Sequence, residues 1–270
     1  MPELQWVVYY LLLGLFVGYF SGLLGIGGGL FMVPLLTFLF EAQHIPSHNI
    51  LHLALGTSMA TILFTSIFSA YQHHQHQAVK WKVVGIITPG LLMGTALGAL
   101  IVGYVSIFYI AIFFILFVYF AAIQMLVGFK PTATRNYPTS WEVTVAGMVI
   151  GAVSSIVSIG GGVLSVPYMV WHKIPLRNAI ATSAALGFPI ALGGSIGYIV
   201  TGFFNGVGLP AQSLGYIYLP ALLWLVIGTL MTVQWGAKST HRLPIDTLRK
   251  IFSLVLFALA TRMLFKLFVK

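Results

Sequence analysis

The sequence predicts an all-α, polytopic helical membrane protein built from two inverted repeats. The chain has 270 residues, of which 59% are hydrophobic and 6% charged, whereas a soluble domain carries roughly a quarter charged residues. Its apolar runs are continuous over about 20 residues rather than alternating, which disfavours a β-barrel. A glycine-rich stretch at 25–34 also has a near copy at 158–167. No hydrophilic stretch is long enough for a separate domain.

The apolar segments fall into two sets of five. In the first repeat, residues 1–128, they lie at about 5–24, 30–40, 50–71, 83–104 and 107–127. A polar linker at 129–141 follows. In the second repeat, residues 142–270, the first segment lies at about 143–157, and a short one runs from the glycines at 160–162 to 171. The other three lie at about 179–200, 217–236 and 251–268. The His- and Gln-rich residues 72–77 are expected to form a loop. Because each half has an odd number of segments, the halves must be inverted relative to each other.

Each glycine-rich stretch reads isoleucine, three glycines, three variable residues and then Val-Pro. A glycine triplet breaks a helix, and in hydrocarbon the freed backbone N–H groups must find partners. Such a break survives where it is buried in protein or lines a polar cavity; the alternative is tight helix packing through small residues. Matched breaks in two halves are typical of a transport site. We therefore expect two hairpins near the membrane midplane, broken at 25–29 and 158–162.

The basic residues predict the orientation of the chain, because cytoplasmic loops carry an excess of Lys and Arg. With the N-terminus outside, the loops predicted inside hold most of the basic residues. These are Lys80, Lys82, Lys130, Arg135, Lys173, Arg177, Lys238, Arg242, Arg249 and Lys250. Only Arg262, Lys266 and Lys270 fall at the outer end. We expect both termini outside and the basic loops in the cytoplasm of a bacterial or archaeal cell, with the bilayer, not nucleic acid, as their partner.

A helix that restarts after a glycine triplet presents free N–H groups and the positive end of its dipole, which together bind anions without a cationic side chain. Nearby hydroxyls can donate to the same ligand, although such residues also serve in helix packing. The candidate substrate-binding residues are Gly27, Gly28, Gly29, Thr57, Ser58, Gly160, Gly161, Gly162, Thr182 and Ser183.

The four acidic residues all fall in or beside predicted loops, which disfavours ion coupling through an embedded carboxylate. If a proton is coupled, His52 is the candidate carrier; the alternative is an ordinary interfacial histidine. The sequence contains no cysteine, which excludes thiolate metal sites and disulfides. The cluster His73-His74-Gln75-His76 lacks a second ligand group at metal-binding spacing. We expect neither a metal nor a cofactor.

The sequence resembles the sulfite exporter TauE/SafE family, also called the toluene-sulfonate-uptake permease family. The resemblance rests on the two IGGG-x3-VP stretches, on Gly56-Thr57-Ser58 and Ala181-Thr182-Ser183, and on the two-repeat layout. It covers essentially the whole chain, although the second copy has Ser158 where the first has Gly25. The resemblance implies movement of small sulfur oxyanions such as sulfite, sulfonates and sulfoacetate.

The leading hypothesis is a secondary transporter of small anions that works by alternating access. An anion channel or facilitator is an alternative, because glycine breaks also build filters. An intramembrane enzyme is disfavoured by the lack of HExxH, GxSxG and embedded acids. The exact substrate, the direction, the coupling ion and a homodimeric state are left open by the sequence.

Overall fold

The computed structural model describes residues 4–24, 28–128, 140–239 and 245–268, and it is almost entirely helical. The first half holds α1 (Leu4–Leu24), α2 (Gly29–Ala42), α3 (Ser47–Gln75), α4 (Trp81–Tyr104) and α5 (Ile107–Val127). The second half holds α6 (Ser140–Val157), α7 (Gly162–Trp171), α8 (Leu176–Asn205), β1 (Ser213–Leu214), β2 (Ile217–Tyr218), α9 (Leu219–Ser239) and α10 (Ile245–Phe268).

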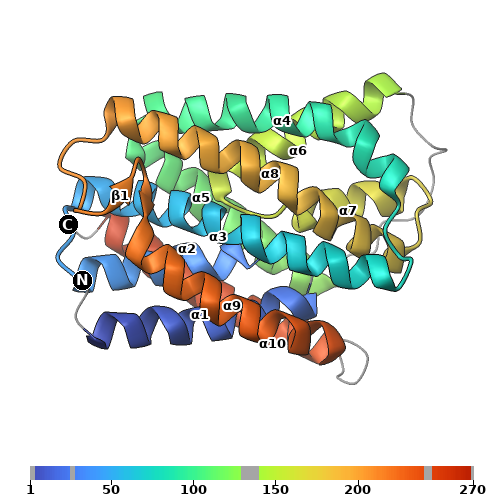
Figure 1. Cartoon of the computed structure of the whole chain (residues 1–270), viewed down its shortest axis with the longest axis horizontal. Coiled ribbons are helices and arrows are strands. Elements are labelled where there is room, and N and C mark those ends of the chain that lie inside the picture. The colour runs from blue at the N-terminus through green and yellow to red at the C-terminus, as the bar shows by residue number, and fades with distance from the viewer. Residues whose placement is uncertain (1–3, 25–27, 129–139, 240–244, 269–270) are drawn as a thin grey trace.

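The helices run roughly along one axis, so the molecule has two ends (Figure 1). The start of α1, the end of α10 and the connections α2–α3, α4–α5 and α8–α9 lie at one end, which we call the N-terminal end. The connections α3–α4 and α7–α8, the end of α9 and the start of α10 lie at the opposite end. Lys80, Lys173 and Arg177 therefore belong to this opposite end.

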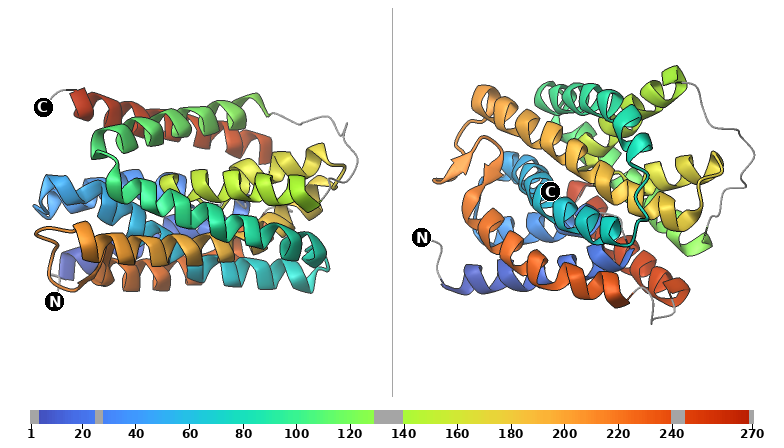
Figure 2. Two further views of the ribbon diagram at one scale, coloured as in Figure 1. Left: turned by 90° about the horizontal axis from the view of Figure 1, so that it is seen from above. Right: turned by 45° about the vertical axis from the view of Figure 1, so that its right-hand side comes forward.

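Two helical hairpins enter this bundle from different ends. Helix α1 runs from the N-terminal end into the molecule, and α2 turns back toward that end (Figures 1 and 2). Helices α6 and α7 form a second hairpin that starts and finishes at the opposite end (Figures 1 and 2). In the first hairpin, Gly28 and Gly29 lie where α2 begins, and in the second, Gly160 and Gly161 lie between α6 and α7.

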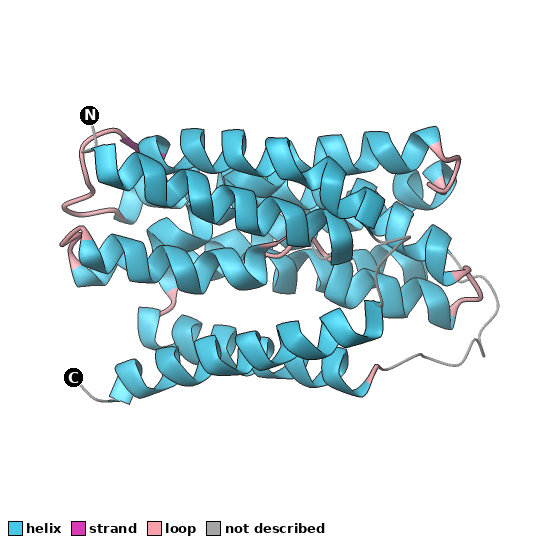
Figure 3. Ribbon diagram, turned by 90° about the horizontal axis from the view of Figure 1, so that it is seen from below, coloured by secondary structure: helices cyan, strands magenta, loops and turns pink. Residues whose placement is uncertain are grey.

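Helices α3 and α8 form the centre of the bundle, since 83% and 72% of their apolar windows are buried, more than in the other long apolar helices. Helix α1 packs against α9, and α4 packs against α6. Both outer contacts are very close, because a Cβ on Gly18 or Gly94 would overlap the backbone of Thr229 or Met148. Helices α5 and α10 pair with each other and form a separate layer at one side (Figure 3).

The described residues include seven helices long and apolar enough to cross a membrane: α1, α3, α4, α5, α8, α9 and α10. The three shorter apolar helices, α2, α6 and α7, all flank a glycine break. Length and composition therefore support an integral membrane protein whose interior contains two interrupted helical elements. The all-helical membrane class predicted from the sequence is confirmed.

Several predicted boundaries are wrong. Residues 72–75, expected in a loop, continue α3, and α8 runs five residues past the expected end, to Asn205. Helix α6 begins at Ser140, inside the expected linker. The span expected at 217–236 begins only at Leu219, because residues 213–214 and 217–218 pair as a small antiparallel hairpin. Gly215 makes its turn with φ +56°, a conformation that favours glycine.

Candidate functional site

The two glycine breaks adopt the same backbone conformation. Gly28 precedes α2 with φ 72° and ψ −14°, and Gly161 precedes α7 with φ 81° and ψ −15°. Both values lie in the left-handed region, where a side chain is strained. Each glycine carbonyl accepts the first intrahelical bonds: Met32 N donates to Gly28 O at 3.1 Å, and Ser165 N donates to Gly161 O at 2.8 Å. Phe31 N and Leu164 N also donate to these carbonyls, at 3.2 and 3.0 Å. Only the N–H groups that precede them, at the very start of α2 and α7, have no acceptor within their own helices.

The described parts of the breaks touch. A Cβ on Gly29 would overlap the carbonyl oxygen of Ser158 and would lie 3.2 Å from Cδ1 of Ile62. Ser158 itself has φ 52° and is held by its hydroxyl, which donates to Leu55 O at 2.7 Å. Gly29 is therefore a position of closest approach, where only a hydrogen fits. Gly27 lies outside the described residues.

A small cavity lies beside this contact, with a volume of about 20 Å³. It is enclosed by the end of α1, the second break and the facing sides of α3 and α8. Its lining consists of Ser21, Ile62, Thr65, Ser66, Ser69, Gly160, Ala184 and Gly187. One water molecule needs roughly 10–15 Å³, so the cavity holds about one water and is too small for an oxyanion. It is small and largely lined by hydroxyls in this conformation.

The hydroxyls on α3 form a single stripe. Ile62 follows Ser58 by four residues, Thr65 and Ser66 follow Ile62 by three and four, and Ser69 follows Ser66 by three, so the four hydroxyl residues lie on one face around Ile62. The hydroxyls of Thr65 and Ser66 donate to the carbonyls of residues 62 and 63. Ser58 is fully buried, and its hydroxyl has no partner within the described part of the chain. A buried unpaired hydroxyl costs free energy, so it is a good candidate to meet a ligand.

Ser154 is a second buried serine without a hydrogen-bond partner among the described residues, and it is only 2% exposed. Its Oγ lies 3.9 Å from the position that a Cβ on Gly161 would occupy, next to the start of α7. Ser21, which lines the cavity, precedes Gly28 by the same seven residues that separate Ser154 from Gly161. The sequence interpretation missed both serines; their matched position in the two halves was the signal that could have found them.

Ser183 is buried like Ser58, but it has a partner. Ser165 Oγ donates to Ser183 Oγ at 2.8 Å, which ties α7 to α8. In the first half, Met32 occupies the position in α2 that corresponds to Ser165, four residues after the capping glycine. Methionine is at most a weak acceptor. The two candidate serines thus lie in corresponding places with different surroundings.

Thr57 and Thr182 are fully buried and share one local role. The Thr57 hydroxyl accepts a hydrogen bond from Tyr218 N at 3.0 Å, and the Thr182 hydroxyl accepts one from Lys80 N at 3.0 Å. Each threonine thereby fixes a connecting segment to one of the two central helices. Whether either also contacts a ligand stays a prediction.

The segments held by these threonines fill the space between α3 and α8 at either end. At the N-terminal end, Tyr216 and Ile217 of the β-hairpin are buried, and Tyr216 N donates to Tyr198 O at 3.1 Å. At the opposite end, Ala78 and Val79 are buried, and Asn178 Nδ2 donates to Ala78 O at 2.8 Å. We call residues 213–218 and 76–80 the two plugs. Burial raises the pKa of Tyr216 above its ordinary value.

His52 lies away from the breaks, against the first plug. Its ring stacks on Tyr216 with 4.7 Å between ring centroids, and its Nε2 lies 3.3 Å from Val102 O. Along α3 it precedes Ile62 by ten residues, or about 15 Å. Its proposed proton-carrying role stays a prediction, but the geometry links it to the plug rather than to the cavity.

The histidines near the end of α3 include one with a structural partner: Trp81 Nε1 donates to His74 Nδ1 at 3.0 Å, which connects α3 to α4. Within the described ranges, no three His, Asp or Glu side chains gather as they would around a metal ion.

Two buried helix breaks, long apolar helices and a small hydroxyl-lined cavity beside the breaks define a membrane transporter as the class of protein that best fits the geometry. The comparison with known families is specific. Residues 10–263 match the family described as "Sulfite exporter TauE/SafE", and the chain belongs to this family.

The relatives carry matching descriptions. A probable membrane transporter protein of Haemophilus influenzae is 37% identical over 95% of this chain and 97% of its own length. One of Bacillus subtilis is 30% identical over 84% and 88%, and one of Methanocaldococcus jannaschii is 27% identical over 91% of each chain. These descriptions name transporters rather than enzymes. No solved structure matches the chain.

Proposed function

We propose that this protein is a secondary transporter of small anions, most plausibly sulfur oxyanions or organosulfonates, and that it holds the anion between the starts of α2 and α7. The observation that carries the proposal is the pair of identically capped helix starts beside a cavity lined by hydroxyls. Ser58 and Ser154, each buried without a partner in the described structure, supply further donors. The family description, which names sulfite, supports the substrate class.

The charge of the site favours a monovalent anion. The start of each helix carries roughly half a positive charge, so two together balance about one negative charge. No basic side chain lines the cavity among the described residues. We therefore expect a monoanionic sulfonate such as methanesulfonate to be preferred over sulfate, because a second negative charge would stay uncompensated in a low-dielectric interior.

The arrangement of helices supports two inverted repeats. The first and fourth helices of one half pack against the fourth and first helices of the other, as α1 with α9 and α4 with α6. The third helices, α3 and α8, pack together, as do the fifth, α5 and α10. We propose that alternating access arises when one plug withdraws while the other stays in place, so that the cavity opens to one side at a time.

The small size of the cavity supports a carrier over a permanently open channel. An oxyanion is larger than the cavity, so binding requires the central helices or a plug to move. A carrier of this kind saturates, whereas channel conductance rises nearly linearly with concentration.

Flux into proteoliposomes tests the proposal directly. Sulfite, methanesulfonate, sulfoacetate, sulfate, taurine and acetate are offered in turn. We expect saturable movement of sulfite or methanesulfonate and weaker movement of sulfate and sulfoacetate, which carry two negative charges at neutral pH. We expect little movement of taurine, a zwitterion, or acetate. Movement of none of the sulfur anions would overturn the substrate class. Unsaturable conductance would favour the channel, and chemical conversion of the substrate would favour an enzyme.

We further propose that the N-terminal end faces outward and the basic end faces the cytoplasm, following the positive-inside rule. The chain contains no cysteine, so single cysteines can be introduced without background. A Val207→Cys protein is expected to react with an impermeant maleimide in intact cells, and a His76→Cys protein only after the membrane is opened. Both positions are exposed. The reverse pattern would overturn the orientation.

A further inference from the structure

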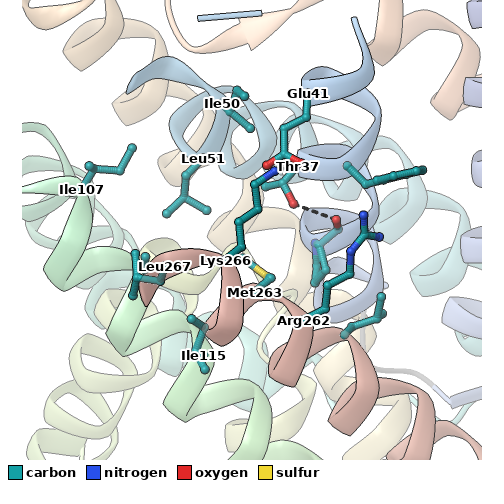
Figure 4. Close-up of a pocket in the computed structure, with 14 residues that line it drawn as sticks. Thr37, Glu41, Ile50, Leu51, Ile107, Ile115, Arg262, Met263, Lys266 and Leu267 are labelled. Carbon is teal, nitrogen blue, oxygen red and sulfur yellow. Dashed lines mark hydrogen bonds and ion pairs between the residues drawn. The ribbon is translucent and has the colours of Figure 1, made fainter. Parts of the chain in front are cut away.

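A second and much larger cavity lies away from the breaks, between α2, α3, α5 and α10. Its volume is about 260 Å³, more than ten times that of the cavity at the breaks. Figure 4 shows side chains of all four helices converging on it. None of the candidate anion-binding residues lines it. It is therefore a separate feature of the molecule.

This cavity, which we call the lateral pocket, has its charged residues toward one end and apolar residues along its whole length. Along α10 its lining extends from Leu259 to Leu267, or about 12 Å at 1.5 Å per residue. Glu41, Arg262 and Lys266 lie toward the N-terminal end of the molecule, where α2 and α10 end. Apolar residues such as Ala111 and Ile115 of α5 line the rest. A ligand that fits this pocket has a polar head and an apolar tail.

The polar end carries one uncompensated positive charge among the described residues. Lys266 forms an ion pair with Glu41, which cancels both charges. Arg262 instead lies over the ring of Phe38, with its Cζ 4.3 Å from the ring centroid, and no carboxylate pairs with it in the described structure. Figure 4 shows Arg262 next to the pocket. A guanidinium beside a membrane calls for an anionic partner, and its planar fork matches a phosphate.

The lateral pocket opens sideways. Phe38 is 44% exposed, and Arg262 is exposed as well, so the pocket is not sealed by the helices around it. Helices α5 and α10 form the outer layer of the bundle (Figure 3). Because the protein is embedded in a membrane, an apolar opening on this side meets lipid chains rather than water. A molecule from the bilayer can enter here without crossing an aqueous mouth.

We propose that the lateral pocket binds a membrane phospholipid with an anionic headgroup. The phosphodiester contacts Arg262, with Lys266 close by, and one acyl chain lies along α5 and α10 over Ala111 and Ile115. The positive charge of Arg262 complements an anionic headgroup, and the apolar lining, which is open to the bilayer, suits an acyl chain. The bound lipid fills the space between the α5–α10 layer and α2, the helix whose start forms part of the candidate anion site.

The test uses the full-length protein in detergent, with native mass spectrometry and thermal unfolding as readouts. Phosphatidylglycerol, phosphatidylcholine, inorganic phosphate and octanesulfonate are added separately. We expect phosphatidylglycerol to bind at least about five-fold more tightly than phosphatidylcholine and to raise the unfolding temperature. Equal binding of the two lipids overturns the anionic selectivity. Equal protection by phosphate or octanesulfonate overturns the lipid as the occupant and indicates a site for soluble anions.

Three variants distinguish recognition of the lipid headgroup from binding of its acyl chain. Arg262→Gln is expected to abolish the preference for phosphatidylglycerol, since it removes the unpaired charge. Ala111→Leu is expected to weaken both lipids by narrowing the apolar part. Lys82→Gln is the matched control, because Lys82 is an exposed basic residue near the start of α4, at the opposite end. If Lys82→Gln reduces lipid preference as much as Arg262→Gln does, binding is a general charge effect and the site is refuted.

Discussion

The break before α2 and the break before α7 have the same backbone conformation but are surrounded by different side chains. Gly28 and Gly161 have nearly equal dihedral angles, and a proline follows each by six residues. In the second half, Ser165 and Ser183 bond to each other. In the first half, Ser58 lies unpaired on a stripe of hydroxyls along α3, whereas the corresponding positions of α8 after Ser183 hold glycine, alanine and isoleucine.

This difference indicates that only the backbone of the break is tightly constrained. The left-handed glycine and the close approach of the two breaks leave no room for a side chain, whereas the neighbouring helices can vary. The two halves therefore contribute unlike groups. In the proposed site, the first half would add hydroxyls of α3 to the start of α2, and the second half would add Ser154 to the start of α7. A bound anion would meet two non-equivalent half-sites, and the following substitutions test that view.

The largest effect is expected at the contact between the breaks. Gly29→Ala places a Cβ against the carbonyl of Ser158, and backbone cannot move aside as a side chain can. We expect destabilisation by about 3 kcal/mol, measured by thermal unfolding in detergent. Gly85→Ala is the control, because no atom lies within 4 Å of its Cβ position. A Gly29→Ala protein as stable as Gly85→Ala would show that the breaks do not touch.

The next largest effect is expected on substrate affinity. Ser154→Ala removes a hydroxyl that has no hydrogen-bond partner among the described residues, so the free energy of unfolding should stay the same or rise slightly. A hydrogen bond to a charged ligand contributes about 1.5–3 kcal/mol, which corresponds to an increase of roughly 10-fold or more in the KM of flux. Ser195→Ala, at another buried unpartnered serine of α8, should leave KM unchanged. Equal KM values for the two variants would remove Ser154 from the site.

A smaller and symmetric effect is expected at the threonines that hold the plugs. Thr57→Val and Thr182→Val keep the shape but leave the N–H of Tyr218 or Lys80 without its acceptor. Each should lower the free energy of unfolding by about 1–2 kcal/mol. Chemical denaturation of the two variants measures both values. A large loss of unfolding free energy in one variant and none in the other would contradict the shared role of the two threonines.

The smallest expected effect is a difference in stability between variants of Ser58 and of Ser183. Ser183→Ala strands the Ser165 hydroxyl and should cost about 1 kcal/mol, whereas Ser58→Ala should cost close to nothing. The double variant Ser165→Ala/Ser183→Ala should recover part of the loss, because neither hydroxyl is then left unpaired. Equal costs for Ser58→Ala and Ser183→Ala would mean that the two half-sites are alike in structure.

Much of the fold could be predicted because apolar length and glycine placement are local properties. The hairpins turn at the triplets because three consecutive glycines neither favour helix nor resist a left-handed dihedral. The β-hairpin at 213–218 was missed because its apolar residues continue into α9, and only Gly215 indicates a turn. Ser154 was missed because most serines inside helices bond to their own backbone, as Ser66 does. The lateral pocket depends on α2, α3, α5 and α10 together, which no single stretch of sequence reveals.

The two threonine-bound amides give the protein one natural reporter for each side of the membrane. The amide of Tyr218 is held by Thr57 at the N-terminal end, and that of Lys80 by Thr182 at the opposite end. If a plug withdraws as proposed, its amide would lose its acceptor and exchange its hydrogen with deuterated solvent. Exchange at Tyr218 alone would mark one open state, and exchange at Lys80 alone the other. Substrate that slows both rates together would reveal a closed, loaded state without any label attached to the chain.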